Sequence, residues 1–311
     1  MRFRLAVVPL AAAMVFGTAA TAFPSGSSGP PGPPPSLPGL SGPALSAWYA
    51  ADARAVASAG RAAARDGNPQ LAAALTALRT RQVLFFDPRG QGMTAVVIGD
   101  LATARRVAVL VPGSDTTLSM FFSRGTASPG GGAAALAAQA RRLDPGNHLV
   151  VIAWLGYAAP ATLSTAVLSS ADAAAGVPAL RSLVTALTRH GDQVALLCHS
   201  YGSVLCGLAA PGLRVTDIAV VGSPGMDATS AAVLGTRARV WAGRGSGDWI
   251  GDVPHVRLFG LGFGADPMSA GFGARVFPAG GGGHSDYFRP GSVSLRNLAW
   301  IALGDPAAVT K

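Results

Sequence analysis

Short apolar runs alternate with Ala-rich segments over most of the chain. The runs are rich in Val, Ile, Leu and Phe and are too short for typical helices, so they indicate strands. The predicted strands cover residues 83–86, 94–98, 107–111, 149–154, 194–198, 218–221, 239–241 and 275–277. The segments between or after them have apolar residues at helical spacing. The predicted helices cover residues 133–143, 179–189, 202–209 and 294–303.

Strands and helices in alternation are typical of an α/β fold with a mostly parallel central sheet and helices on both faces. The near-continuous apolar run at 194–197 fits a central strand that is buried on both faces. Before the first strand, residues 44–81 are Ala-rich with Leu and Arg at helical spacing. The sequence Gly67-Asn68-Pro69 interrupts this segment, which predicts two helices joined by a turn. Residues 44–311 are therefore expected to form the α/β domain, and residues 44–81 are its N-terminal helical segment.

The N-terminal 22 residues have the pattern of a secretory signal peptide, with two arginines, an apolar run and a small-residue site at Ala20-Thr21-Ala22. The apolar run has about 12 residues, whereas a membrane-spanning helix needs roughly 20. Residues 23–43 are rich in Pro, Gly and Ser and predict a linker without a core. We therefore expect an exported, extracellular protein with no transmembrane segment in the mature chain; an uncleaved N-terminal anchor is the alternative.

Composition agrees with a folded domain, because half of the 311 residues are apolar and 13% are charged. The formal net charge is +9, and Lys311 is the single lysine, so arginine supplies almost all of the excess. The sequence contains no dense basic block and no basic stretch interleaved with aromatic residues. Nucleic-acid binding is therefore not predicted.

The segment "CHSYG" at 198–202 lies between a predicted strand and a predicted helix. A serine on such a turn, with small residues two positions before and after it, is the pattern of a nucleophile elbow. Ser200 is therefore the candidate nucleophile, with Gly202 at the second small position and Cys198 in place of the usual glycine at the first. His199 adjoins the serine, and its side chain is expected to pack away from the hydroxyl.

A serine nucleophile needs a general base and an acid that orients the base. His284 follows the last predicted strand across a Gly-rich loop and is the candidate base; His255 is the weaker choice. Asp248 follows a predicted strand and a Gly-rich turn and is the candidate acid. Asp227 and Asp252 remain alternatives to Asp248.

The oxyanion that forms during acyl transfer needs backbone donors. One is expected from Tyr201, the residue after the nucleophile, and the other from a loop after an earlier strand. The sequence Pro112-Gly113-Ser114-Asp115 follows the predicted strand 107–111 and fits this second role. The amide of Ser114 is the candidate donor. The amide of Asp115 could be an additional donor.

Cys198 and Cys206 are the only cysteines. An even count in a chain with an export signal favours a disulfide bond, and a helix that runs back along the strand would bring the two residues close together. Two buried free thiols are the alternative. No Cys and His residues have the spacing of metal ligands, so neither a metal nor a cofactor is expected.

Nine segments together resemble an α/β-hydrolase family of unknown function that is frequent in high-G+C bacteria. They are "FFDPRGQG", "VLVPGSDT", "CHSYGS", "VVGSPGMD", "GDWI", "FGADP", "FGARVF", "GHSDYF" and "SLRNLA". The resemblance covers about residues 44–303 and implies an α/β-hydrolase fold. It matches Ser200 to the family's nucleophile, Asp248 to its acid and His284 to its base. It implies no substrate, because the same fold supports many reactions.

These observations predict a secreted serine hydrolase that cleaves a small-molecule or lipid carboxylic ester through an acyl-enzyme. One alternative is a catalytically silent binding or cell-envelope protein on the same scaffold. Another is an acyltransferase or lipase of envelope lipids, for which the apolar loops "LSMFF" and "LFGLGFG" would matter.

Overall fold

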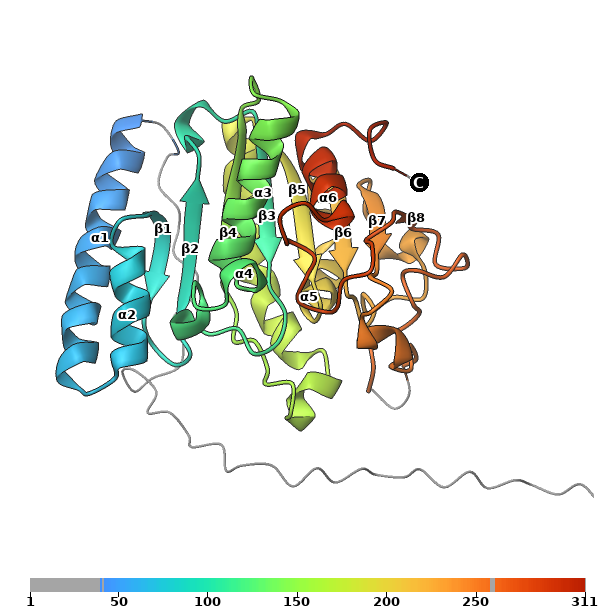
Figure 1. Ribbon diagram of the computed structural model, residues 1–311, viewed down its shortest axis with the longest axis horizontal. Helices are drawn as coiled ribbons and strands as arrows, with labels where there is room; N and C mark the ends of the chain where they lie inside the picture. The colour runs from blue at the N-terminus through green and yellow to red at the C-terminus, as the bar shows by residue number, and fades with distance from the viewer. Residues whose placement is uncertain (1–39, 41, 258–260, 311) are drawn as a thin grey trace, which may run out of the picture.

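The computed structural model describes residue 40 and residues 42–257 and 261–310 (Figure 1). The predicted signal peptide and most of the predicted linker lie outside the described residues, and so do residues 258–260 of the loop "LFGLGFG". Within the described part of the chain, no helix has the length and apolar character that a membrane span requires.

Within the described residues, eight strands form one sheet in the order β1-β2-β4-β3-β5-β6-β7-β8. Their bounds are β1 (Gln82–Asp87), β2 (Met93–Ile98), β3 (Arg106–Val111), β4 (Leu149–Leu155), β5 (Gln193–His199), β6 (Asp217–Val221), β7 (Arg239–Gly243) and β8 (Arg275–Val276). β2 is antiparallel to both of its neighbours, β1 and β4, and all other pairs are parallel. The predicted α/β fold with a mostly parallel sheet is thereby confirmed, and each predicted strand is present.

Alternation of side chains along the central strands creates two cores. In β3, Val107 and Val109 join one apolar cluster, whereas Ala108 and Leu110 join the other. Helices α4 (Ala171–His190) and α5 (Gly202–Ala209) pack on the first cluster. Helices α3 (Pro129–Leu143) and α6 (Val293–Leu303) pack on the second and cover the face that is turned to the viewer in Figure 1. Burial on both faces explains why these strands read as continuous apolar runs.

The N-terminal helical segment is an antiparallel pair beside β1 (Figure 1), consisting of α1 (Gly42–Arg65) and α2 (Pro69–Leu78). Asn68 lies at the predicted turn, where its side chain accepts a hydrogen bond from the amide of Leu71 at 3.1 Å and caps α2. Trp48 ties α1 to the sheet, because its indole N–H donates to the carbonyl of Leu84 at 2.6 Å. α1 begins at Gly42, two residues before the predicted boundary.

Helix α3 begins at Pro129, four residues before the predicted start, and α4 begins earlier still relative to its pattern. α4 starts at Ala171 and continues through Pro178, whereas the sequence favoured a start after that proline. The first half of α4 packs closely on its neighbours, since a Cβ at Gly176 would lie 2.6 Å from Leu205 and 2.7 Å from Tyr157. Tertiary packing here outweighs the loss of one helical hydrogen bond at proline.

In the described part of the chain, the loops contain six short 3₁₀ helices. They are η1 (Leu101–Thr103), η2 (Leu118–Met120), η3 (Gly125–Ala127), η4 (Thr165–Leu168), η5 (Ala231–Leu234) and η6 (Trp249–Asp252). η2 includes most of the loop "LSMFF", in which Leu118 and Phe121 are buried in the second core. That loop therefore contributes mainly to core packing.

Candidate active site

Ser200 lies on the sharp turn between β5 and α5. Its φ of 53° is in the left-handed region that non-glycine residues rarely adopt. A hydrogen bond from its amide to the carbonyl of Val221, at 3.0 Å, holds this conformation. Gly202 permits the close approach, because a Cβ there would lie 2.5 Å from the carbonyl oxygen of Pro112. The turn has the geometry expected of a nucleophile elbow.

The structure brings Ser200, His284 and Asp248 together, although they come from three separate loops. Nε2 of His284 lies 2.8 Å from Oγ of Ser200. Nδ1 of His284 lies 2.9 Å and 3.1 Å from the two carboxylate oxygens of Asp248. Because a carboxylate only accepts, Nδ1 carries the hydrogen and Nε2 accepts from the serine hydroxyl. This arrangement is the one that general-base activation of a serine requires.

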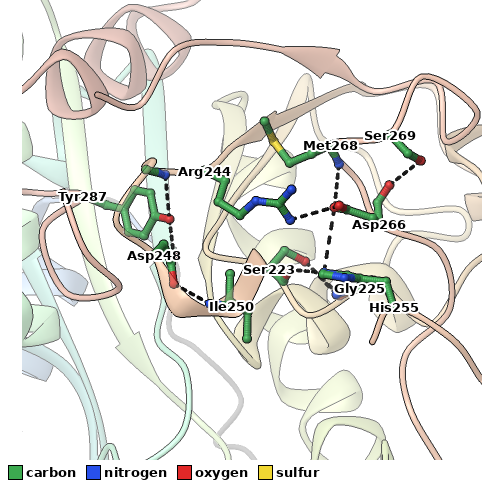
Figure 2. A network of polar contacts seen from close by, with 11 residues as sticks. Ser223, Gly225, Arg244, Asp248, Ile250, His255, Asp266, Met268, Ser269 and Tyr287 are labelled. Carbon is green, nitrogen blue, oxygen red and sulfur yellow. Dashed lines mark hydrogen bonds and ion pairs between the residues drawn. The ribbon is translucent and has the colours of Figure 1, made fainter. Parts of the chain in front are cut away.

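Asp248 is fully surrounded by donors. Besides His284, the phenol of Tyr287 donates to Oδ2, and the amide of Ile250 donates to Oδ1 at 2.9 Å. Figure 2 shows Tyr287 and Ile250 approaching the carboxylate from two sides. Burial by itself would raise the pKa of Asp248, but the hydrogen bonds from His284, Tyr287 and Ile250 outweigh it and hold the pKa below the ordinary value. The carboxyl group is thus kept ionised beside the imidazole.

The alternative base and acids have other partners or lie elsewhere. His255 donates from Nε2 to the carbonyl of Ser223 at 3.2 Å and lies 3.8 Å from Asp266, in a separate polar cluster (Figure 2). Asp227 accepts from the guanidinium of Arg257 at 2.6 Å. Asp252 is exposed at the end of η6. Within the described residues, Asp248 is therefore the carboxylate that contacts His284.

The two candidate oxyanion donors, the amides of Tyr201 and Ser114, have no hydrogen-bond partner in the described part of the chain. The amide of Asp115, in contrast, donates to the carbonyl of Pro160 at 3.0 Å. Ser114 and Tyr201 both line the pocket that contains Ser200. The structure therefore leaves the Ser114 amide available and occupies that of Asp115.

Buried phenols hold both donor segments in place. The hydroxyl of Tyr157 donates to the carbonyl of Pro112 at 2.7 Å. The hydroxyl of Tyr201 donates to the carbonyl of Ser169 at 2.7 Å and accepts from the amide of Ala173 at 3.2 Å. Both tyrosines are almost fully buried, and fixed donors need no reorganisation when charge develops on a substrate.

His199 has a polar contact in addition to the expected packing. Its Nε2 lies 2.7 Å from the carbonyl oxygen of His284, and the two ring centroids are 4.8 Å apart. Burial and the neighbouring imidazole of His284 lower the pKa of His199 to about 4. His199 is therefore a neutral donor to the main chain of the residue that carries the candidate base.

Cys198 and Cys206 form a disulfide bond, with their Cα atoms 6.6 Å apart. Both residues are completely buried, Cys198 at the end of β5 and Cys206 in the middle of α5. The bond joins the strand before Ser200 to the helix after it. Cys198 thus occupies the position where the elbow pattern usually has glycine, and its side chain is used as a cross-link.

A pocket of about 330 Å³ opens beside the serine, which is at the lower end of the usual range for ligand sites. Ser200, His284 and the oxyanion candidates Tyr201 and Ser114 all contribute to its lining. The candidate nucleophile, the candidate base and the residues of both oxyanion candidates therefore line one pocket.

Three further residues contribute to this site without having been predicted from the sequence, namely Tyr287, Tyr157 and Trp249. Tyr287 lies three residues after His284, and Trp249 directly follows Asp248, so proximity to a candidate residue was the available signal. Trp249 packs against the imidazole of His284 with ring centroids 4.8 Å apart. No local signal marks Tyr157, whose contact with Pro112 joins residues 45 positions apart.

The fold and the elbow define the class of this protein as an α/β-hydrolase. A family model described as alpha/beta hydrolase matches residues 87–258, more than half of the chain. The protein therefore belongs to the alpha/beta hydrolase family, as the resemblance of its motifs predicted. The matched region includes Ser200 and Asp248 and ends before His284.

Curated relatives occur in mycobacteria. An uncharacterized protein of Mycobacterium tuberculosis is 33% identical over 255 residues, which cover 70% of this chain and 38% of the relative. An uncharacterized protein of Mycobacterium bovis is 36% identical over 155 residues, covering 48% of this chain and 58% of the relative. The chain thus matches little more than a third of the first relative's length.

Solved structures with a similar fold include two hydrolases. The dienelactone hydrolase from Anabaena variabilis has a TM-score of 0.46 and 13% identity, with 71% of this chain and 93% of that chain covered. The esterase PE8 has a TM-score of 0.44 and 17% identity, with coverages of 67% and 97%. At these values the similarity concerns the arrangement of strands and helices alone.

Proposed function

We propose that this protein is a serine hydrolase that cleaves carboxylic esters by way of an acyl-enzyme. The observation that carries the proposal is the continuous hydrogen-bond chain from Oγ of Ser200 through the imidazole of His284 to Asp248. Membership of the alpha/beta hydrolase family supports the reaction class. We favour esters over amides because an ester carbonyl is more electrophilic than a resonance-stabilised amide carbonyl, and an alkoxide is a better leaving group than an amide anion.

In the acylation step, Oγ of Ser200 attacks the ester carbonyl carbon while its proton moves to Nε2 of His284. The carbonyl oxygen becomes an oxyanion and receives hydrogen bonds from the amides of Tyr201 and Ser114. Asp248 stabilises the imidazolium through Nδ1. When the intermediate collapses, the bond to the alcohol oxygen breaks, and Nε2 returns the proton to the departing alcohol.

In the deacylation step, a water molecule takes the place of the alcohol. His284 accepts a proton from the water as its oxygen attacks the acyl carbon, and the same two amides stabilise the second oxyanion. The bond to Oγ of Ser200 then breaks, and the proton returns to the serine. The products are a carboxylic acid and free enzyme, so the cycle needs no cofactor.

A fluorophosphonate probe tests this proposal, because it phosphonylates only an activated serine. We expect labelling of the wild-type protein and no labelling of Ser200→Ala, with hydrolysis of nitrophenyl acetate reduced by about 10⁶-fold. Ser246→Ala, at an exposed serine outside the pocket lining, is the matched control and should behave as wild type. Absence of labelling and of hydrolysis in the folded wild-type protein would instead identify a silent binding scaffold.

We also propose that residues 1–22 are a cleaved signal peptide and that the mature protein is extracellular. The Cys198–Cys206 disulfide supports this, because such bonds persist mainly outside the reducing cytosol. N-terminal sequencing of the protein from the culture medium tests the proposal. A mature chain that begins at Phe23 is expected; a protein retained in cells with Met1 or Arg2 at its start would contradict it.

A further inference from the structure

Two large apolar side chains are half exposed at the pocket beside Ser200. Leu168 is 51% exposed and Trp249 is 50% exposed, and both belong to the pocket lining. Large apolar side chains that remain in water next to a cavity indicate a binding surface when they are continuous with an apolar interior. The question is therefore what these two side chains contact when substrate is bound.

Trp249 connects the pocket mouth with the proposed catalytic base. Its indole ring packs against the imidazole of His284, with centroids 4.8 Å apart and planes tilted by 43°. The backbone around it is fixed, because the side chain of Asp248 accepts from the amide of Ile250 and caps η6. One part of the indole thus covers the imidazole, while half of the residue remains available to a ligand.

Leu168 is held at the mouth by a long-range contact. It ends η4, and its carbonyl accepts a hydrogen bond from the amide of Gly262 at 3.0 Å. The apolar lining also includes Val167 and Val253, which are half-buried, and Phe263, which is 7% exposed. The apolar part of the lining therefore includes the buried Phe263 as well as the half-exposed Leu168 and Trp249.

Another part of the lining is polar and follows the oxyanion loop. It consists of Asp115, Thr116, Arg124, Thr126 and Ser128. Asp115 is already engaged, because its Oδ1 accepts from the amide of Thr162 at 2.9 Å. The lining thus combines polar and apolar side chains, and Asp115 and Arg124 are exposed at the surface as Leu168 and Trp249 are.

We propose that Trp249 and Leu168 are specificity-determining residues that bind the hydrocarbon chain of the substrate where it leaves the pocket. The substrate class is then an ester with a long hydrocarbon chain and a polar remainder. This inference rests on the proposed ester hydrolysis at Ser200. Its physical basis is the transfer of apolar chain and side-chain surface out of water, worth roughly fourfold in affinity for each buried methylene.

A chain-length series tests the inference. kcat/KM is measured for nitrophenyl esters from acetate to decanoate, each below its critical micelle concentration, and for alkyl acetates from methyl to decyl. We expect kcat/KM to rise by about fourfold for each methylene that contacts the mouth. A rise in the first series assigns the chain to the acid, and a rise in the second assigns it to the alcohol.

Substitutions show which residues produce the rise. The readout in each series is kcat/KM for the substrate with the ten-carbon chain divided by kcat/KM for the substrate with the shortest chain. This ratio should fall by about tenfold or more in Trp249→Ala and in Leu168→Ser. A ratio is used because Trp249 also contacts His284, so that its loss changes kcat/KM for every substrate. Val233→Ser and Val276→Ser, at exposed apolar residues outside the lining, should keep the wild-type ratio.

The outcomes separate this inference from the proposal on which it rests. If wild-type protein is labelled at Ser200 and hydrolyses short and long esters equally, the inference is wrong and the ester hydrolase stands. An unchanged ratio in both Trp249→Ala and Leu168→Ser likewise overturns it. If the protein neither hydrolyses any ester nor reacts with the fluorophosphonate, both proposals are wrong.

Discussion

Nε2 of His199 donates a hydrogen bond to the carbonyl oxygen of His284 over 2.7 Å, although 85 positions separate the two residues. The contact joins the residue before the candidate nucleophile to the main chain of the candidate base. This hydrogen bond therefore helps to fix the distance between Ser200 and the imidazole of His284. We regard His199 as a positioning residue, since it acts through His284.

Removal of this hydrogen bond should lower kcat more than it changes KM. In His199→Leu the carbonyl of His284 loses its donor, and a small displacement of a reacting group can cost about 100-fold in rate. We expect a 10- to 100-fold lower kcat with nitrophenyl acetate and a KM within about twofold of wild type. His199→Gln keeps an N–H donor and should recover part of the rate; equal kcat in the Leu variant and wild type would contradict the positioning role.

His199 should also make stability depend on pH. Its pKa is lowered from 6.5 to about 4 in the folded protein, first by burial, so between these pH values the unfolded chain binds more protons. The free energy of unfolding should therefore be highest above pH 6.5 and fall by at most roughly 3 kcal/mol as the pH drops to 4. Urea unfolding of wild type and His199→Gln at pH 7 and pH 4.5 checks this. The variant should show a shallower fall, and identical falls would contradict the assignment.

The eight strands of the described sheet could be predicted because most are short apolar runs between Gly, Pro or polar residues, as in 107–111 and 218–221. Their order could not, since β4 is inserted between β2 and β3 and no local pattern encodes which strand is its neighbour. The predicted start of α4 was wrong for a related reason. The packing of Gly176 against Tyr157 and Leu205, which stabilises the first half of that helix, is a long-range contact.

In the candidate site, too, local patterns predict some residues, whereas others depend on long-range contacts. Ser200, Asp248 and His284 each follow a predicted strand, so the shared carboxyl edge of a parallel sheet was enough to group them. The prediction that Cys198 and Cys206 lie close together was confirmed, because a helix that follows a strand directly must pack back along it. The phenols of Tyr157 and Tyr287 could not be assigned, since their roles depend on the exact positions of Pro112 and Asp248.

Tyr287→Phe should impair catalysis without removing any member of the Ser200–His284–Asp248 chain. The phenol donates to Asp248 and accepts from the amide of Gly245 at 3.2 Å. A hydrogen bond to a charged group contributes about 1.5–3 kcal/mol, so we expect kcat to fall by about 10- to 100-fold. Steady-state kinetics with nitrophenyl acetate checks this, with the thermal midpoint as a test of folding. A wild-type kcat in the folded variant would show that His284 and Ile250 suffice to hold Asp248.

The Cys198–Cys206 bond should stabilise the fold more than it promotes the reaction. It closes a short loop, for which the chain-entropy estimate is roughly 2–3 kcal/mol. The double variant Cys198→Ala/Cys206→Ala should lose about that amount in urea unfolding and should still be labelled at Ser200. Dithiothreitol should destabilise wild type and leave the double variant unchanged. An equal effect of the reductant on both proteins would mean that it acts elsewhere.

Gly113→Ala should disable the oxyanion site while leaving the fold intact. A Cβ at this position would lie 2.6 Å from Cβ of Ser200 and 3.1 Å from its Oγ, closer than non-bonded atoms tolerate. The loop that carries the Ser114 amide must therefore move away from the nucleophile, and loss of one oxyanion donor costs about 10²–10³ in kcat. Gly146→Ala is the matched control, because its Cβ would meet only Asp144 at 3.7 Å, an ordinary contact. The test is to measure kcat for both variants, with circular dichroism to verify folding. A wild-type kcat in Gly113→Ala would show that the oxyanion does not lie beside the amide of Ser114.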